Sequence, residues 1–284
     1  MGSSDQSFEH GPNTSGIQAK TAVENFQPTP HADVNAIIRE LFSSITAVLG
    51  SQIVGVYLDG SLASGDFDQD SDIDFVVITK EPINAEEFAE LQAMHDRIAL
   101  LDSVWAIQLE GFYISKQAVR RFDPAQPDYP NIERGPGERL KLVPHELTWN
   151  IHRHILRERG ITLLGPAPET LIDPITANDL RQTMSVILRG WAADILNHLE
   201  WIQPRGYQSY VVLSICRILY TLEHGDVVSK KAALAWAYGH LEHQWTDLLQ
   251  RAWVGRHHSD QQAGPQDISG TLDLIRYALA KISD

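Results

Sequence analysis

Residues 55–79 read GVYLDGSLASGDFDQDSDIDFVVIT, and this stretch decides the fold of the first half of the chain. An apolar run, 54–58, ends at Gly60-Ser61, an acidic stretch follows, and a second apolar run continues to Ile78. Apolar runs of this length on either side of a glycine turn predict two strands with a short acidic connection. Gly60 is typical of a point where another backbone or a phosphate comes close.

Asp72 and Asp74 lie two residues apart at the start of the second run. The period of two along a strand points both carboxylates to the same face. Two such carboxylates repel each other. At the end of a buried strand they are tolerated mainly when a divalent cation sits between them. Hard oxygen ligands of this kind suit Mg²⁺, which also binds phosphate oxygens. We therefore expect a Mg²⁺ site at this end of the strand.

Two other interpretations of the acidic stretch are weaker. A calcium loop of the EF-hand type needs Gly and Glu at its sixth and twelfth places, where this chain has Ser71 and Val77. A simple solvated turn does not explain why Asp72 and Asp74 enter an apolar run.

A third carboxylate on a neighbouring strand would complete a site for two metals, or for one metal and a general base. Glu110 is the best candidate because it lies between apolar residues, where a lone charge needs a reason. Asp102 is the runner-up, and a solvent-facing strand position is the alternative for Glu110. His152 and His154 face different ways on a predicted helix, so we interpret them as surface or core histidines rather than metal ligands.

Composition limits the class of protein and its partners. A chain of 284 residues with 43% hydrophobic content suits two domains. The net charge is −14, from 23 basic and 37 acidic residues, which disfavours nucleic acid as a partner and favours a small cationic molecule. The single cysteine, Cys216, excludes an internal disulfide and indicates a reducing cytoplasm. No apolar run reaches membrane-spanning length, so we expect no membrane partner.

The pattern along the chain predicts an α+β fold in three parts. Residues 1–29 are expected to form a disordered tail, 30–168 a domain with a mixed sheet and helices, and 169–284 an α-helical bundle. In the middle part we expect helices over 34–49, 84–101, 115–122 and 144–160, strands over 54–58, 73–78, 104–114 and 161–166, and an exposed loop over 124–136 that closes over a substrate. In the last part we expect helices over 178–201, 207–224, 229–241, 243–254 and 267–282.

Two stretches resemble a known family. Gly60-Ser61 followed by Ser71-Asp72-Ile-Asp74 resembles the nucleotidyltransferase superfamily, which includes polymerase-beta-like enzymes. Residues 213–236, LSICRILYTLEHGDVVSKKAALAW, resemble the helical domain of the streptomycin/spectinomycin adenylyltransferases. The resemblance covers roughly residues 53–241 and implies a nucleotidyltransferase domain followed by that helical domain.

The resemblance also implies roles for residues. Gly60, Ser61 and Ser71 would hold the nucleotide, Asp72 and Asp74 would bind Mg²⁺ with Glu110 as a third ligand, and Glu110 would take the proton from the substrate hydroxyl. From the helical domain, Arg217 and Lys230 would reach the phosphates. A structural ion pair with Glu223 is the alternative for Arg217, and Lys231 is the alternative for Lys230.

The acceptor-binding residues of the family are not matched in register. The corresponding stretch here contains Glu200 and Trp201, and together with Asp194 these are the candidates for binding the acceptor. This departure leaves the identity of the acceptor open.

We therefore expect a cytoplasmic, monomeric enzyme that transfers AMP from ATP, with Mg²⁺, to a hydroxyl of a small cationic acceptor such as an aminoglycoside. Two alternatives remain. One is a transferase of the same fold that modifies another metabolite or a protein hydroxyl, as in toxin–antitoxin pairs. The other is a nucleotide sensor without turnover.

Overall fold

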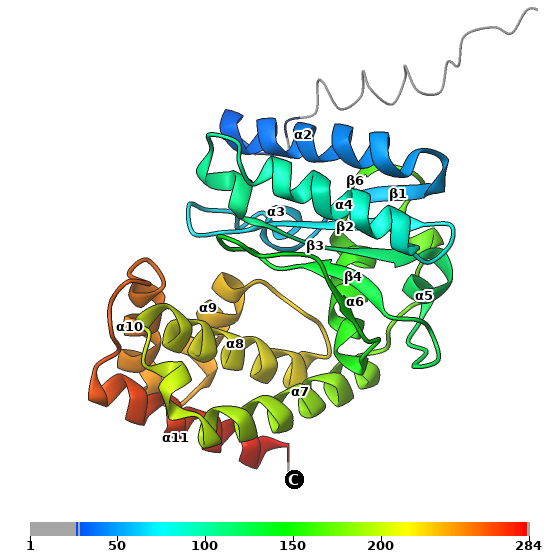
Figure 1. Cartoon of the computed structure of the whole chain (residues 1–284). Coiled ribbons are helices and arrows are strands. Elements are labelled where there is room, and N and C mark those ends of the chain that lie inside the picture. The colour runs from blue at the N-terminus through cyan, green and yellow to red at the C-terminus, as the bar shows by residue number, and fades with distance from the viewer. Residues whose placement is uncertain (1–26, 28, 283–284) are drawn as a thin grey trace, which may run out of the picture.

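The computed structural model describes residues 27 and 29–282 and contains a mixed sheet followed by a bundle of helices (Figure 1). The predicted α+β class, with the sheet first and the helical bundle second, is confirmed. The predicted tail lies almost wholly outside the described residues. Its last residue, Thr29, is an exception, since it is buried and its carbonyl accepts a 2.9 Å hydrogen bond from the side-chain amide of Asn35.

Within residues 29–282, six strands form one sheet in the order β5-β4-β3-β2-β1-β6. Only β2 and β3 pair in parallel, and every other neighbouring pair is antiparallel. The strands are β1 (Ile53–Leu58), β2 (Ile73–Thr79), β3 (Leu109–Ser115), β4 (Tyr129–Ile132), β5 (Lys141–Val143) and β6 (Ile161–Leu164).

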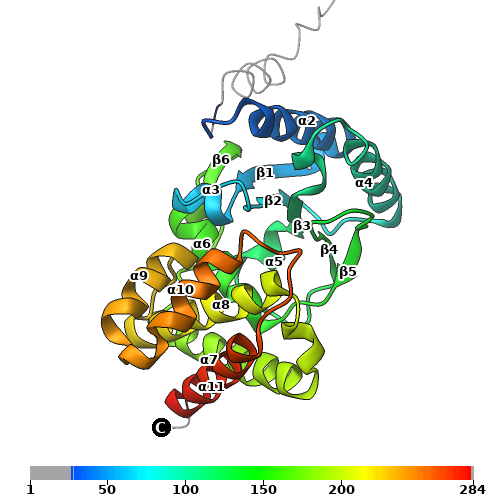
Figure 2. The same cartoon turned by 90° about the vertical axis from the view of Figure 1, so that its left-hand side faces the viewer.

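The two faces of the sheet have different partners. Phe75 and Val77 of β2 pack against helices α2 (Ala32–Leu49) and α4 (Ala85–Ile98), which cover one face. Val76 and Ile78 point to the other face, toward α5 (Lys116–Arg120) and α6 (Asn150–Arg159). Figure 2 shows the helical bundle on this second side of the sheet. Because side chains alternate along a strand, Asp74 belongs to the face that looks toward the bundle.

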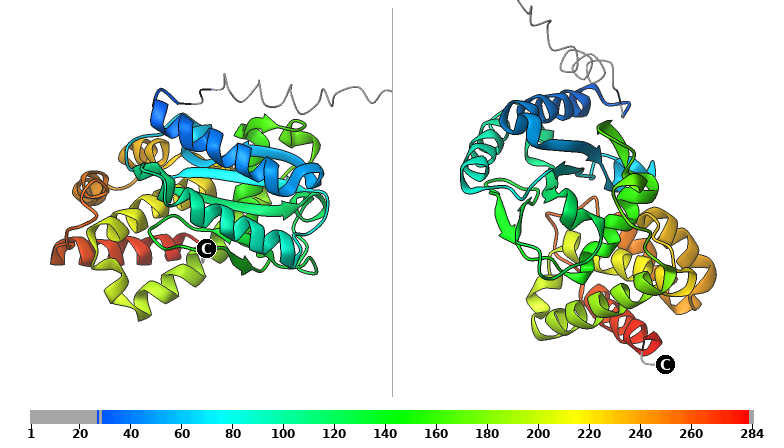
Figure 3. Two further views of the ribbon diagram at one scale, coloured as in Figure 1. Left: turned by 45° about the horizontal axis from the view of Figure 1, so that its top comes forward. Right: turned by 90° about the vertical axis from the view of Figure 1, so that its right-hand side faces the viewer.

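The bundle is built around α8, which contacts α7, α9, α10 and α11 (Figure 3). Its apolar core is continuous and buried. In the part of the chain that is described, no helix combines the length and apolar character that crossing a lipid bilayer requires. The five helices are α7 (Ala177–Asn197), α8 (Arg205–His224), α9 (Lys230–His240), α10 (Thr246–Gly255) and α11 (Pro265–Lys281).

The strand predicted over 104–114 is wrong in its first half. Residues Val104–Ile107 form a 3-10 turn, and β3 begins only at Leu109. The Ser103 hydroxyl accepts a hydrogen bond from the Trp105 backbone amide, and the Trp105 indole donates a 2.8 Å hydrogen bond to Asp33 on α2. These contacts bend the segment over the end of the sheet, which an alternating pattern does not reveal.

The exposed loop predicted over 124–136 is also wrong in part. It contains β4, which pairs with β3, and Tyr129 and Ile132 are buried. The helix predicted over 144–160 begins later, at Asn150, after a 3-10 turn. Both differences arise from tertiary contacts, since β4 pairs with β3 and β5, and Trp149 of the 3-10 turn packs against the Tyr129 ring.

Gly111 on β3 has a steric role that a substitution can test. A Cβ at this position would lie 2.5 Å from both the Phe75 carbonyl oxygen and the Phe75 ring. We expect Gly111→Ala to lower the free energy of unfolding by about 1–3 kcal/mol, as overpacking does elsewhere. Gly190→Ala is the matched control, since nothing lies within 4 Å of that site on α7, and it is expected to stabilise the protein by about 0.5–1 kcal/mol. Urea unfolding measures both, and equal effects would contradict the packing argument.

Candidate active site

The Gly60-Ser61 corner lies directly against the acidic strand. Gly60 has φ +58°, and a Cβ there would overlap the Asp74 carboxylate, so only glycine fits. The Asp59 amide donates to the Asp74 carbonyl at 3.1 Å, which joins the corner to β2. The Ser61 hydroxyl and one Asp59 carboxylate oxygen are buried without a hydrogen-bond partner among the described residues. Buried polar atoms of this kind are ready to bind a ligand.

Asp74 and Glu110 are neighbours on parallel strands. Asp74 of β2 pairs with Glu110 of β3, so the two side chains lie on the same face of the sheet. Burial, with repulsion from Asp72, Asp59 and Glu110, raises the pKa of Asp74 well above its usual range. Burial and the Asp72 charge likewise raise the pKa of Glu110. The site therefore holds several carboxylates that destabilise one another's ionised forms.

The donor set fits a divalent cation, which would offset this repulsion and satisfy the unpartnered Asp59 oxygen. Within the described residues, however, no three His, Cys, Asp or Glu side chains gather closely enough to form a ready metal site. Asp72 instead approaches the Arg134 guanidinium at 3.5 Å. The assignment of Asp72, Asp74 and Glu110 as metal ligands stays a prediction.

Two cations from the bundle face these acids. Arg217 on α8 is close enough to Asp74 and Asp59 to feel their charges, although burial is the larger influence and lowers its pKa. Burial and the Arg217 charge lower the pKa of Lys230, at the start of α9, while Asp72 and Asp74 oppose this shift. Lys231 instead lies 3.9 Å from Asp66 and is largely exposed. Of the two lysines, Lys230 is therefore the one beside Asp72 and Asp74.

Ser71 has a structural contact rather than a free hydroxyl. Its oxygen accepts a hydrogen bond from the Asp68 amide at 3.0 Å and donates to the Asp68 carboxylate at 3.1 Å. Ser71 thus shapes the loop before Asp72, and its role in nucleotide binding stays a prediction.

Comparisons with known proteins agree with this two-part arrangement. Residues 43–118 match the family model "Polymerase beta, Nucleotidyltransferase", and residues 170–279 match "Aminoglycoside adenylyltransferase, C-terminal domain". An Escherichia coli aminoglycoside (3'') (9) adenylyltransferase is 22% identical over 264 residues, covering 88% of this chain and 97% of the relative. This chain is an aminoglycoside adenylyltransferase-like nucleotidyltransferase.

Further relatives of this nucleotidyltransferase carry similar names. A spectinomycin 9-adenylyltransferase of Staphylococcus aureus is 26% identical over 227 residues, covering 77% of this chain and 81% of the relative. A solved spectinomycin adenyltransferase from Enterococcus faecialis, with ATP and spectinomycin, has a TM-score of 0.63 at 14% identity, covering 88% of this chain and 99% of that one. The likeness to the solved structure shows that the fold is shared.

The predicted acceptor residues of the nucleotidyltransferase lie at the end of α7 and in the turn that follows. Asp194, Glu200 and Trp201 are exposed. Glu200 lies 3.2 Å from the His198 ring nitrogen, and the Trp201 ring stacks on His198 at 4.8 Å. Their role in acceptor binding stays a prediction.

Sequence reasoning missed an aromatic group beside Glu110. Tyr210 on α8 is near enough to Glu110 and Arg217 to feel both charges. Its ring lies 5.8 Å from those of Tyr207 and Trp191, and the Trp191 indole donates a 3.1 Å hydrogen bond to the Tyr207 hydroxyl. The sequence does carry a signal, since Tyr210 and Arg217 are seven residues apart and so lie on the same face of α8.

His152, which the sequence led us to interpret as a surface or core histidine, lies at the site. Its Nδ1 atom lies 3.9 Å from the Asp59 carboxylate, its ring packs 5.0 Å from that of Phe112, and its charge reaches Glu110. The next residue, Arg153, is wholly buried and donates to the Val119 and Ala118 carbonyls at the end of α5. Arg153 thereby fixes α6 on the sheet with His152 at the site. His154 instead pairs with Asp226 at 2.8 Å.

The crowding of carboxylates predicts that Asp74→Asn stabilises the metal-free protein. A raised pKa in the folded state means that stability is lost as pH rises from the unfolded value of 3.8 through the folded pKa. At pH 7 we expect Asp74→Asn to raise the melting temperature in EDTA by roughly 3 °C, the shift that about 1 kcal/mol produces in a chain of this size. This increase in melting temperature should become smaller as the pH is lowered toward 4.

The control for this experiment is Asp102→Asn, in an exposed position after α4. Thermal unfolding followed by circular dichroism measures both variants. A lower melting temperature for Asp74→Asn than for Asp102→Asn at pH 7 would contradict the electrostatic argument.

Proposed function

We propose that this enzyme transfers AMP from ATP to a hydroxyl of an aminoglycoside. The observation that carries the proposal is the pairing of Asp74 with Glu110 across β2 and β3, opposite Lys230 and Arg217 of the bundle. Acids on one side and cations on the other suit a nucleotide triphosphate held between the two parts of the chain. The relatives named as aminoglycoside and spectinomycin adenylyltransferases support the acceptor class.

In this proposal Glu110 acts as the general base. Burial and the neighbouring Asp72 charge raise its pKa, and a carboxylate with a raised pKa is better matched to proton abstraction near neutral pH. Glu110 takes the proton from the acceptor hydroxyl, the hydroxyl oxygen bonds to the α-phosphorus of ATP, and pyrophosphate leaves with the electrons of the broken P–O bond.

The other site residues bind the nucleotide. The Ser61 hydroxyl and the turn at Gly60 hold the triphosphate, and Lys230 and Arg217 contact the phosphates that leave. Asp72 and Asp74 are the residues that would hold Mg²⁺, with Glu110 adjacent. When bound, the cation would neutralise the charge of the triphosphate. Positioning and charge neutralisation therefore provide most of the rate enhancement.

The acceptor is expected to be cationic. The net charge of −14 draws cations toward the protein, and Asp194, Glu200 and Trp201 are proposed to contact the acceptor from the bundle. Tyr210 is near enough to Glu110 to feel its charge, and its ring holds the Lys230 ammonium 4.8 Å from its centre, so it is proposed to position Lys230 at the site.

The decisive experiment incubates the protein with ATP, Mg²⁺ and separate aminoglycosides, including streptomycin and spectinomycin. Mass spectrometry then detects an acceptor that has gained AMP, and an enzyme-coupled assay detects pyrophosphate. Pyrophosphate release with cell lysate but with none of the aminoglycosides would contradict the acceptor class and favour another metabolite or a protein hydroxyl. Binding of ATP without pyrophosphate release in any mixture would contradict turnover.

Replacement of the proposed base tests its role directly. We expect Glu110→Gln to reduce kcat by about 10²–10⁴, the range in which general-base catalysis contributes, while ATP still binds. Glu90→Gln, an exposed change on α4, is the matched control and should leave kcat unchanged. Steady-state kinetics and isothermal titration separate turnover from binding, and a Glu110→Gln enzyme as active as the control would refute the assignment.

Removal of the proposed metal ligand gives a separate prediction. Addition of Mg²⁺ and a non-hydrolysable ATP analogue should raise the melting temperature of the wild type, because ligands that bind only the folded state stabilise it. We expect Asp74→Asn to lose most of the increment that depends on Mg²⁺. An equal Mg²⁺ increment in both proteins would contradict the role of Asp74 in binding the metal.

A further inference from the structure

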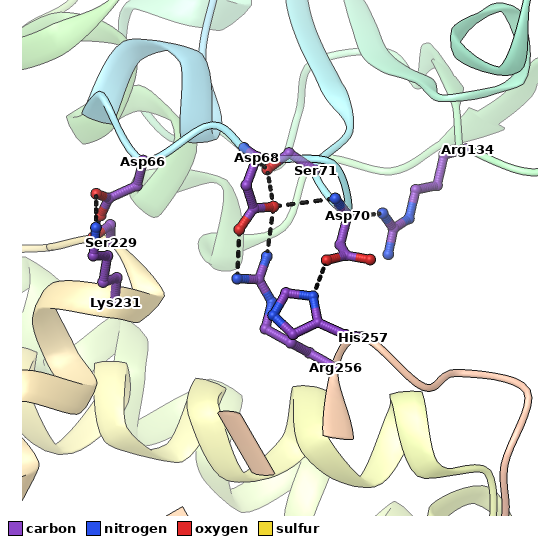
Figure 4. Close-up of polar contacts among 9 residues, drawn as sticks. All are labelled: Asp66, Asp68, Asp70, Ser71, Arg134, Ser229, Lys231, Arg256 and His257. Atoms are coloured by element: carbon purple, nitrogen blue, oxygen red, sulfur yellow. Dashed lines mark hydrogen bonds and ion pairs between the residues drawn. The ribbon is translucent and has the colours of Figure 1, made fainter. Parts of the chain in front are cut away.

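The acidic loop, residues 66–71, contacts the helical bundle through three of its aspartates (Figure 4). Asp66 accepts a hydrogen bond from the Ser229 hydroxyl, which itself caps the start of α9. Asp68 pairs with Arg256 and Asp70 pairs with His257, both in the segment that follows α10. The loop that leads into the proposed catalytic strand is therefore held by the other half of the molecule.

The contact between Arg256 and Asp68 has the strongest geometry of the three. Two guanidinium nitrogens donate to the two carboxylate oxygens at 2.7 and 2.9 Å. The guanidinium also lies 4.7 Å from the centre of the Trp253 ring, and only 18% of the Arg256 side chain is exposed. A two-bond ion pair that is stacked on an aromatic ring and largely shielded from water fixes one orientation of both partners.

Asp68 also contacts the residues that lead directly to the site. Its carboxylate accepts hydrogen bonds from the Ser71 hydroxyl and the Asp70 amide, each at 3.1 Å. Ser71 is buried and directly precedes Asp72. An arginine of the bundle therefore helps to fix the backbone that presents Asp72, although it does not belong to the proposed set of nucleotide ligands.

The same contact fixes the bundle relative to the sheet. Arg256 directly follows α10, which packs on α8, the helix that carries Arg217. Ser229 and Lys231, on either side of Lys230, both contact Asp66. The cations proposed to meet the phosphates are thus held opposite Asp72 and Asp74 by the loop that leads to these acids.

We propose that Arg256 is a positioning residue, whose ion pair with Asp68 locks the bundle onto the acidic loop and so keeps Lys230 and Arg217 over the nucleotide site. The inference rests on the proposed function, since it takes ATP as the ligand of this site. Without the pair, fewer molecules have both halves of the site in register. The apparent affinity for ATP falls in proportion to that fraction.

The experiment is a double-mutant cycle read by nucleotide binding, which needs no acceptor. A non-hydrolysable ATP analogue with Mg²⁺ is titrated into the wild type, Arg256→Gln, Asp68→Asn and the double variant. The Asp68→Asn side chain keeps an oxygen that can accept a hydrogen bond from the Ser71 hydroxyl. Arg276→Gln is the matched control, because Arg276 pairs with Asp273 on α11 at 2.8 Å with both side chains more than half exposed.

We expect each single variant to weaken binding about tenfold and the double variant to bind no more weakly than either, as for two residues that act through one contact. The control should bind like the wild type, and Arg256→Lys should recover part of the loss because it keeps the charge. In X-ray scattering without nucleotide, Arg256→Gln should have a larger radius of gyration than the control.

Several outcomes would overturn the proposal. If the wild type binds the analogue and Arg256→Gln binds it equally well, the ion pair does not position the site, while the proposed function stands. Losses that multiply in the double variant would show that Arg256 and Asp68 act independently. If the wild type does not bind the analogue, the proposed function itself fails. Should Arg256→Gln not fold, Asp68→Asn provides the same comparison from the other side of the pair.

Discussion

The arrangement of the site depends on how the repulsion between carboxylates in a partly buried space is offset. Asp59, Asp72 and Glu110 all raise the cost of ionising Asp74, at the edge of the sheet where β1 ends and β2 and β3 begin. Burial adds to this cost, because a charge in a low-dielectric site has lost its water. Protonation of Asp74 relieves this repulsion, and so does opposite charge, for which the bundle and a bound cation are the two available sources.

The two halves of the chain supply opposite charges to the site. The sheet provides the acids and the glycine corner, while α8 and α9 provide Arg217 and Lys230. Burial lowers the pKa of both cations, while the acids of the sheet oppose this shift. Each half of the chain therefore contains charge that the other half stabilises. This mutual dependence explains why contacts between the halves, such as Arg256 with Asp68, bear on the chemistry.

Local sequence patterns predicted most elements and failed where tertiary contacts decide conformation. The helix over Ala32–Leu49 was readable from apolar periodicity, because it buries one face. The strands on either side of the acidic loop were readable from continuous apolar runs, because the sheet is covered on both faces. The turn at Val104–Ile107 and the short strand β4 were not, since both depend on partners distant in the chain. Tyr210 was missed, and His152 was not recognised as a site residue, for the same reason, as each joins the site from another segment.

The sequence by itself determined the chemical kind of site: a glycine corner, two acids at strand spacing and a third acid in an apolar run. These are local features, and their residue types limit what they can bind. Only the tertiary structure decided that Asp74 pairs with Glu110, because the parallel register of β2 and β3 depends on the packing of the whole sheet. It also decided that Lys230 rather than Lys231 lies beside these acids, since the docking of α9 against the acidic loop sets which side of the helix faces them.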